Sequence, residues 1–296
     1  MLSFLENIKS GKILLSDGAM GSLLMEKGFK HGECPENLNL TQPEILEEIA
    51  QLYFEAGSDI IQSNTFGASP MKLSEYGLDG KTEEINRAGV SIAKNVVRDR
   101  AYVYGSCGPS GKILQPFGDG DPDELQAGFE RQIAAMVSAE VDAVFIETMT
   151  DLNEAKIAVR AARTVAPEIT VAACMTFENT PKGYITIMGN NLVDAASELA
   201  AAGADMIGSN CGNGIETMIK IAVELKKVSN LPLIIQSNAG LPINKGGQII
   251  YPETPQFFAG KVSELIDAGV SVIGGCCGTT PDTIRAMRKS LDANIS

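Results

Sequence analysis

The sequence contains no tryptophan and only one histidine, His31, in 296 residues. Histidine is the side chain that most often relays protons near neutral pH, so its scarcity argues against a histidine-based acid–base mechanism. No uninterrupted apolar run approaches the roughly 20 residues that a membrane-spanning helix needs. The N-terminal segment, with Glu6 near its start, does not resemble a signal peptide. The sequence therefore predicts a cytoplasmic protein with no membrane partner.

Positive charge is also scarce, because 24 Lys and Arg residues stand against 37 Asp and Glu residues, for a formal net charge of −13. Such a chain repels nucleic-acid phosphates and anionic lipids, so we expect no nucleic acid as a partner. The chain is 44% hydrophobic and long enough to bury a large core. Since no low-complexity linker divides it, we expect a single domain spanning residues 1–296.

Paired Cys-x-x-Cys motifs, which are typical of structural zinc knuckles, are missing although the chain has six cysteines. The six are Cys34, Cys107, Cys174, Cys211, Cys276 and Cys277. Without an export signal, thiols are expected to be reduced and available for metal binding or catalysis. Two of them are adjacent in "GGCCG", residues 274–278. Neighbouring residues of a regular strand point to opposite faces, so both can serve one site only if the glycines let the backbone leave strand geometry.

One phrase recurs along the chain, as "FEAGSDIIQSNTFG" from Phe54, "LAAAGADMIGSNCG" from Leu199 and "LIDAGVSVIGGCCG" from Leu265. In each copy a helical pattern ends at Ala-Gly, and a short apolar run and a polar loop follow. Glycine is the expected residue just past a helix C-terminus. A fourth copy, from Met136, has Glu140 in place of the glycine. The repeat predicts alternating helices and strands.

Short apolar, β-branched runs predict eight strands, separated by amphipathic stretches. They are residues 12–16, 59–63, 101–105, 143–146, 170–175, 205–209, 233–237 and 271–274. Eight strand–helix units in a chain of this length predict an α/β fold of the (β/α)8 TIM-barrel type. A doubly wound open sheet is the alternative, because short buried strands look alike in both folds. The Gly-, Pro- and Asp-rich segment 108–124 is a candidate lid over the barrel mouth.

Active sites of such barrels lie at the carboxyl ends of the strands, so the residues that end or follow each run are candidates. They are Asp17, Gly18, Asn64, Ser106, Cys107, Glu147, Thr176, Asn210, Cys211, Asn238, Cys276 and Cys277. Closure of the barrel would bring Cys211, Cys276 and Cys277 close together. Three thiolates suit zinc, which takes four tetrahedral ligands and keeps one position open when it is catalytic. We interpret Cys34, Cys107 and Cys174 as ordinary small residues.

A zinc ion with three thiolate ligands carries a formal charge of −1 and generates hydroxide poorly. It suits the binding of a fourth, substrate thiol in deprotonated form, against an ordinary thiol pKa near 8.5. The expected chemistry is alkyl transfer to that sulfur. The alternatives are that the cysteines are merely buried, or that Cys276 and Cys277 form a redox sensor or metal store in a protein that is no enzyme.

Three segments, "DGAMGS" at Asp17, "SNC" at Ser209 and "GGCCGTTP" at Gly274, resemble the signatures of the homocysteine S-methyltransferase family. The resemblance covers essentially the whole chain. With "GPSGKILQPFG" included, it is most similar to the homocysteine-binding module of cobalamin-dependent methionine synthases. It implies a zinc-containing barrel that makes methionine from homocysteine, with Cys211, Cys276 and Cys277 as the zinc ligands.

The amino-acid end of homocysteine needs partners for an ammonium and a carboxylate. We expect Asp17 and Glu147 to bind the ammonium, and the backbone N–H groups of Gly18 and Ala19 to bind the carboxylate. The simpler interpretation is that Asp17 and Gly18 form only a turn and Glu147 caps a helix. Asn238 is a candidate for the fourth position on zinc until the thiol arrives, with an ordinary hydrogen-bonding role as the alternative.

The methyl donor is the least determined element of this interpretation. The Asp-x-His-x-x-Gly element of cobalamin-binding modules is absent from the sequence. A methylcobalamin donor would therefore have to arrive on a separate corrinoid protein, and this is the donor that we predict. S-methylmethionine, S-adenosylmethionine and betaine, which members of the family use, are the alternatives, because each carries a positive centre that an acidic barrel mouth attracts. Betaine is ranked last, because betaine-dependent members are longer and have a C-terminal arm that this sequence lacks. Another thiol as acceptor also stays open.

Overall fold

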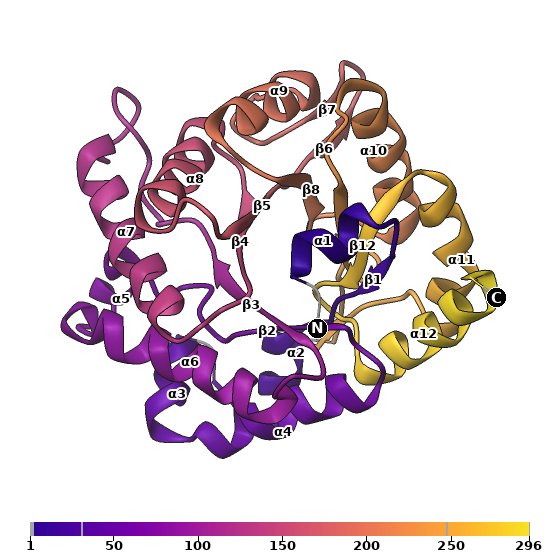
Figure 1. The fold of residues 1–296 in the computed structure, drawn as a ribbon, viewed down its shortest axis with the longest axis horizontal. Coiled ribbons are helices and arrows are strands. Elements are labelled where there is room, and N and C mark those ends of the chain that lie inside the picture. Colours follow the sequence, from indigo (N-terminus) through magenta and orange to yellow (C-terminus); the bar gives the residue numbers. More distant parts are fainter. Residues whose placement is uncertain (1–2, 31, 247, 296) are drawn as a thin grey trace.

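The computed structural model describes residues 3–30, 32–246 and 248–295, so His31 lies outside the described residues. Eight parallel strands pair in the order β1-β12-β9-β8-β5-β4-β3-β2. A parallel bridge between Ser16 and Ile60 joins the two ends of this sheet. The sheet therefore closes into a barrel with the helices around it (Figure 1). The predicted TIM barrel is confirmed, and the open-sheet alternative is wrong.

The barrel strands overlap all eight predicted runs. They are β1 (Leu14–Leu15), β2 (Ile60–Gln62), β3 (Tyr102–Cys107), β4 (Ala143–Met149), β5 (Thr170–Met175), β8 (Met206–Asn210), β9 (Leu233–Ser237) and β12 (Val270–Gly275). Two antiparallel hairpins follow β5 and β9, namely β6 (Glu178–Thr180) with β7 (Gly183–Ile185), and β10 (Ile243–Lys245) with β11 (Gln248–Ile250). The sequence analysis missed both hairpins, because three-residue strands at the surface carry no buried alternating pattern.

Helices separate successive barrel strands, as the amphipathic stretches predict. They are α1 (Phe4–Lys9), α2 (Met20–Glu26), α3 (Leu38–Thr41), α4 (Pro43–Glu55), α5 (Pro70–Ser74), α6 (Thr82–Val97), α7 (Pro122–Ser138), α8 (Leu152–Val165), α9 (Leu192–Ala202), α10 (Ile215–Val228), α11 (Pro255–Asp267) and α12 (Pro281–Ile295). Two short 3-10 helices cover Pro35–Asn37 and Asp79–Lys81. Among the described residues, none of the helices is both long enough and apolar enough to cross a bilayer.

The recurring Ala-Gly phrase marks the turn from a helix into the next strand. Gly57, Gly203 and Gly269 have φ angles of 101°, 110° and 79°, which lie in the left-handed region that glycine tolerates best. Glu140, which replaces the glycine in the fourth copy, has φ of 61°. The same backbone turn is therefore made four times, once with a side chain that is strained there.

An apolar cluster fills the barrel interior toward the N-terminal ends of the strands. It contains Phe4, Ile8, Leu14, Ile60, Tyr102, Tyr104, Ala143, Phe145, Ala172, Cys174, Met206, Ile234 and Val272. Phe4 and Ile8 come from α1, which lies across the opening of the barrel in Figure 1. The ring of Phe4 packs edge-on against Tyr102 and Tyr104, with centroid separations of 5.3 and 5.1 Å. The short helix α1 thus closes one end of the barrel.

The candidate lid after β3 is shorter than predicted, because α7 already begins at Pro122. Asp121 caps this helix by accepting hydrogen bonds from the backbone N–H groups of Asp123 and Glu124. Near its start the loop is fixed, since the backbone N–H and the hydroxyl of Ser110 both donate to buried Glu154. A lid motion of this loop stays a prediction. So does the prediction that residues 1–296 form a single domain.

Candidate active site

Three cysteine sulfurs converge at the carboxyl ends of neighbouring strands. Cys211 follows β8, Cys276 and Cys277 follow β12, and β9 lies between these strands in the sheet. The three sulfurs lie within 4.8 Å of one another, and the Cys211 and Cys277 sulfurs are 3.9 Å apart. Tetrahedral zinc with bonds of about 2.3 Å separates its sulfur ligands by about 3.8 Å. The donor set and its spacing therefore fit a zinc ion.

The backbone leaves regular geometry at both cysteine segments, as the sequence predicts. Strand β12 ends at Gly275, where an added Cβ would lie 2.2 Å from the Thr279 hydroxyl oxygen. That hydroxyl donates to the carbonyl of Cys276 over 2.7 Å, which fixes the turn that carries the cysteine pair. Cys211 has φ of 59° and is followed by Gly212 at 74°. A left-handed cysteine is strained, and such strain is common at functional sites.

The three thiols titrate as one group. Hydrogen bonds from Cys276 and Cys277 lower the pKa of Cys211 to about 3. The same hydrogen bonds to Cys211 raise the pKa of Cys277 to about 11 and that of Cys276 well above its usual value. One negative charge thus forms readily in the cluster, whereas three would require a cation. A thiophilic metal ion supplies that charge.

Two carboxyl groups, Asp17 and Glu147, are buried at the same mouth of the barrel. Burial raises the pKa of each to about 7. Within residues 3–30, 32–246 and 248–295, no Lys or Arg forms an ion pair with either group. A buried carboxylate without a cationic partner is costly, so this pair is suited to a cation supplied by a ligand.

Hydrogen bonds fix both carboxylates in place. Asp17 accepts from the backbone N–H of Gln62 over 2.8 Å. Glu147 accepts from the Gln62 amide over 3.2 Å, from the Asn210 amide over 2.9 Å and from the Ser106 hydroxyl. Helix α8 has its own N-cap, Asp151. The helix-cap interpretation of Glu147 is therefore wrong, and the carboxylate faces the barrel mouth instead.

The sequence analysis missed two glutamines, Gln62 and Gln236, whose hydrogen bonds join the side chains around the two carboxylates. The side-chain amide of Gln236 donates to the Ser16 hydroxyl over 3.1 Å and to the side-chain Oε1 of Gln62 over 3.4 Å. Both glutamines end or nearly end an apolar strand, β2 or β9, and their polarity there was the available signal. The sequence analysis considered mainly the residues after each strand. The last one or two residues of a barrel strand also reach the site, because alternate side chains of each strand point into the barrel.

Of the other candidates from the sequence, Gly18, Ala19 and Asn238 lie at the site, whereas Asn64 does not. The backbone N–H of Ala19 donates to the Thr279 hydroxyl over 3.2 Å, and a Cβ on Gly18 would lie 2.6 Å from the same oxygen. Asn238 is buried, and its Oδ1 atom has no hydrogen-bond partner among the described residues. Its amide also forms a hydrogen bond that lowers the pKa of Cys211. Asn64 lies elsewhere, because it donates to the Pro35 carbonyl and shapes a loop.

The other three cysteines are buried and separate from the cluster. Burial raises the pKa of the Cys34 thiol to about 12, and it also raises the pKa values of Cys107 and Cys174 well above the usual value. Cys107 donates to the Gln132 side chain over 3.3 Å, facing α7 instead of the barrel mouth. Their burial agrees with the interpretation as ordinary small residues, which stays a prediction.

A tyrosine that the sequence analysis missed also borders the sulfurs. Tyr251 follows β11 and is half-buried, with its ring against Gly278. Burial and the neighbouring Cys277 raise the pKa of Tyr251 to about 12. The side chains of Tyr251 and Cys277 are near enough for each to shift the pKa of the other. The residue had no predictive signal, because its position depends on the hairpin that precedes it.

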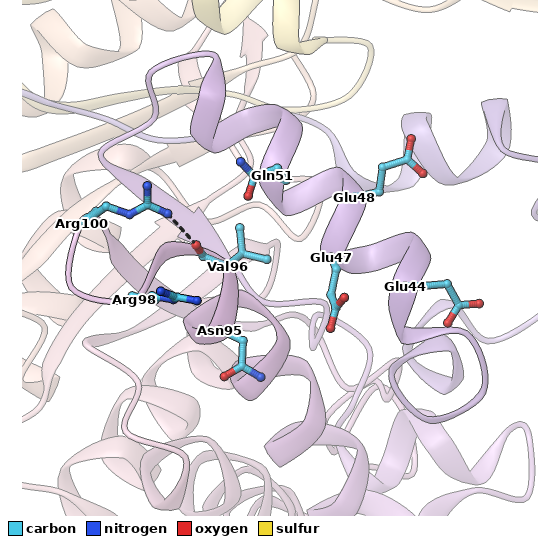
Figure 2. A pocket seen from close by; sticks show the side chains of 8 residues that line it. All are labelled: Glu44, Glu47, Glu48, Gln51, Asn95, Val96, Arg98 and Arg100. Carbon is cyan, nitrogen blue, oxygen red and sulfur yellow. Dashed lines mark hydrogen bonds between the residues drawn. The ribbon is translucent and has the colours of Figure 1, made fainter.

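A cavity of about 630 Å³ lies elsewhere, on the outer layer between α4 and the end of α6. Figure 2 shows the side chains that line it, which are Glu44, Glu47, Glu48, Gln51, Asn95, Val96, Arg98 and Arg100. The Arg100 guanidinium donates to the Val96 carbonyl over 3.1 Å. The lining includes none of the cysteines, so this cavity is not the candidate active site.

Comparison with known proteins identifies the family. The model of the homocysteine S-methyltransferase family matches residues 14–291, nearly the whole chain. The chain belongs to this family. Methionine synthase from Mycobacterium leprae is 34% identical over 291 residues, and that from Mycobacterium tuberculosis is 32% identical over 306. These matches cover 93% and 98% of the chain but only 24% and 25% of the two relatives, so the chain spans about a quarter of their length.

Solved structures of the fold include the homocysteine methyltransferase MmuM from Escherichia coli. Its metallated form matches with a TM-score of 0.79 and 23% identity, covering 96% of this chain and 98% of that one. Its apo form matches with a TM-score of 0.74, also at 23% identity. At this level of identity the match confirms the barrel fold of this member of the homocysteine S-methyltransferase family.

Proposed function

We propose that the protein methylates homocysteine to methionine, with Cys211, Cys276 and Cys277 holding a zinc ion and Asp17 and Glu147 holding the substrate ammonium. One observation carries the proposal: three converging sulfurs occupy the same barrel mouth as two buried carboxylates that have no Lys or Arg partner in the described part of the chain. Homocysteine has both complementary groups, a thiol and an ammonium. Membership of the homocysteine S-methyltransferase family supports the same substrate.

Zinc held by the three cysteines would supply a Lewis acid that lowers the pKa of the substrate thiol and keeps one position open for it. Asn238 could occupy that position beforehand, since its buried Oδ1 atom lacks a protein partner among the described residues. A neutral amide oxygen is a weaker zinc ligand than a thiolate. Its displacement by substrate would therefore be favourable.

The chain's own residues would orient the substrate. Gln62 fixes both carboxylates, through its backbone N–H to Asp17 and its side chain to Glu147. We expect the substrate carboxylate near Gly18 and Ala19, where the Ala19 N–H would exchange its Thr279 partner for the ligand. Fixing both ends of the amino-acid group aligns the sulfur for in-line attack on a methyl group.

The donor that we propose is a methyl-corrinoid carried by a separate protein or domain. Large apolar side chains are exposed on the loops that follow β3, β5 and β9, all at the barrel mouth: Ile113, Phe117, Ile187, Leu241 and Ile249. Phe117 is 86% exposed. Several large apolar side chains exposed at one end of a protein are typical of a surface that binds another macromolecule. The curated relatives, methionine synthases four times longer, are consistent with such a partner.

A parallel assay tests donor and acceptor separately. Zinc-loaded protein and homocysteine are offered a methylated corrinoid protein, free methylcobalamin, S-methylmethionine, S-adenosylmethionine or betaine, and methionine is measured. We expect methionine from the corrinoid donors. Methionine from sulfonium donors alone would overturn the donor but retain the acceptor. If no donor yields methionine and homocysteine releases no proton on binding, the proposed function is wrong.

A further inference from the structure

A short segment that follows the β10–β11 hairpin connects the loops of the sulfur cluster. This strap, residues 251–253, contacts each of them in turn. The backbone N–H of Glu253 donates to the carbonyl of Ala239, next to Asn238, over 2.9 Å. The Glu253 carboxylate accepts from the backbone N–H of Ile215 over 3.1 Å, at the start of α10 and just past the Cys211 loop.

Tyr251 contacts the third loop, which carries the cysteine pair. A Cβ at Gly278 would lie 2.1 Å from the Tyr251 ring, so the ring fills the space that this glycine leaves. Gly278 also has a left-handed φ of 79°, which disfavours any other residue. The ring therefore rests directly on the backbone beside Cys277, with its hydroxyl near enough to the Cys277 side chain for each group to shift the pKa of the other.

We infer that Tyr251 is a positioning residue of the metal site, which holds the Cys277 sulfur in place by a hydrogen bond. This inference rests on the proposed function, since it concerns zinc held by the same cysteines. A tyrosine keeps its proton at neutral pH, so its hydroxyl donates and the sulfur accepts. The backbone of Cys277 is already fixed, because its carbonyl accepts from the Ala239 N–H over 2.9 Å. Only the side-chain rotamer is left for Tyr251 to fix.

The physical consequence is a slower release of the metal. Groups that hydrogen-bond to a metal ligand keep that ligand oriented, and their removal typically costs roughly 10–100-fold in metal affinity. Removal of the Tyr251 hydroxyl frees the Cys277 side chain to rotate away from the other two sulfurs. The retention of zinc should then fall although all three cysteines are still present.

The test compares Tyr251→Phe with wild-type protein, using two readouts other than activity. Zinc dissociation into excess chelator should be about tenfold faster in the variant. Cobalt-substituted protein should show a shifted sulfur-to-metal charge-transfer band, because one thiolate has lost a hydrogen bond. Tyr251→Ala, which also removes the ring, should release zinc at least as fast. Tyr184→Phe, in the β6–β7 hairpin, is the matched control and should behave as wild type.

The outcomes separate the possible errors. If Tyr251→Phe releases zinc within twofold of the wild-type rate and leaves the cobalt spectrum unchanged, the hydroxyl does not position Cys277 and the inference is overturned. A fast release in Tyr251→Ala alone would assign the residue to packing only, which also overturns it. If the wild-type protein retains no zinc, the proposed function itself fails. The melting temperatures of the metal-free variants show whether each one folds.

Discussion

The two ends of the barrel interior are built from the same strands and have opposite characters. Toward the N-terminal ends, Tyr102, Tyr104 and Phe145 pack in an apolar cluster with Phe4 of α1. At the carboxyl ends the interior is polar, with Asp17, Gln62, Glu147, Asn210 and Gln236 joined around the mouth. Buried polar groups cost stability that apolar packing at the other end must offset. Stability and chemistry are thus separated along the barrel axis.

The largest effect should come from the polar end. Cys276→Ala removes one of three converging sulfurs, so zinc retention and methyl transfer should both fall to background. Zinc content per chain and methionine formation measure the two losses. Folding should persist, because the apolar end is untouched, and Cys174→Ala is the control that removes a buried thiol outside the cluster. Full activity in Cys276→Ala would sink the metal-site assignment.

A change at the apolar end should lower the stability of the fold and leave zinc binding unchanged. Phe4→Ala deletes a ring that is 2% exposed and packs against two tyrosines, which should lower the free energy of unfolding by about 3–5 kcal/mol. Denaturant unfolding measures this loss. Zinc affinity of the folded protein should not change. A large loss of zinc in the folded variant would contradict the separation of the two ends.

Neutralising a carboxylate at the mouth should affect substrate binding alone. Glu147→Gln keeps the shape but removes the charge, so homocysteine affinity should fall roughly 10–100-fold while zinc stays bound, as expected for a lost hydrogen bond to a charged group. Calorimetry with zinc-loaded protein measures it. Glu154→Gln alters a buried carboxyl that instead anchors Ser110, and serves as the comparison. Unchanged affinity would remove Glu147 from the site.

The pKa values of the carboxyl pair predict a pH dependence of ligand binding. Burial raises the pKa of Asp17 and Glu147 to about 7, so both ionise between pH 6 and 8. Ammonium binding should strengthen over this range. The free protein should lose stability between about pH 4 and pH 7 and level off above it, because the folded carboxyls keep their protons over a range in which those of the unfolded chain have already lost theirs. Methionine has the ammonium without a thiol, so its affinity reports the carboxylates alone; a pH-independent affinity would argue against them.

The smallest effect concerns the backbone at the apolar end. Glu140 is in the left-handed region, where the other copies of the repeat have glycine. Glu140→Gly should relieve this strain and stabilise the fold by roughly 0.5–1 kcal/mol, with no change in zinc or homocysteine binding. Thermal unfolding measures the gain. Gly203→Ala, at the equivalent turn with φ of 110°, should have the reverse effect.

By itself the sequence determined the barrel and the convergence of its thiols. Eight apolar runs and a repeated helix-to-strand turn are local signals, and they place Cys211, Cys276 and Cys277 at the same end of the strands. The family signatures added a prediction of the substrate. These features could be predicted because each depends on residues close together in the chain.

Tertiary structure alone decided how the site is lined. Gln62 and Gln236 meet across the barrel although 174 residues separate them, and only the closed register brings their amides together. Tyr251 reaches Cys277 because a surface hairpin, which has no buried pattern, turns the chain back over the mouth. Burial, which raises the pKa of Asp17 and Glu147, is likewise a property of the assembled barrel. Contacts between residues distant in sequence leave no local pattern, so they appear only once the chain has folded.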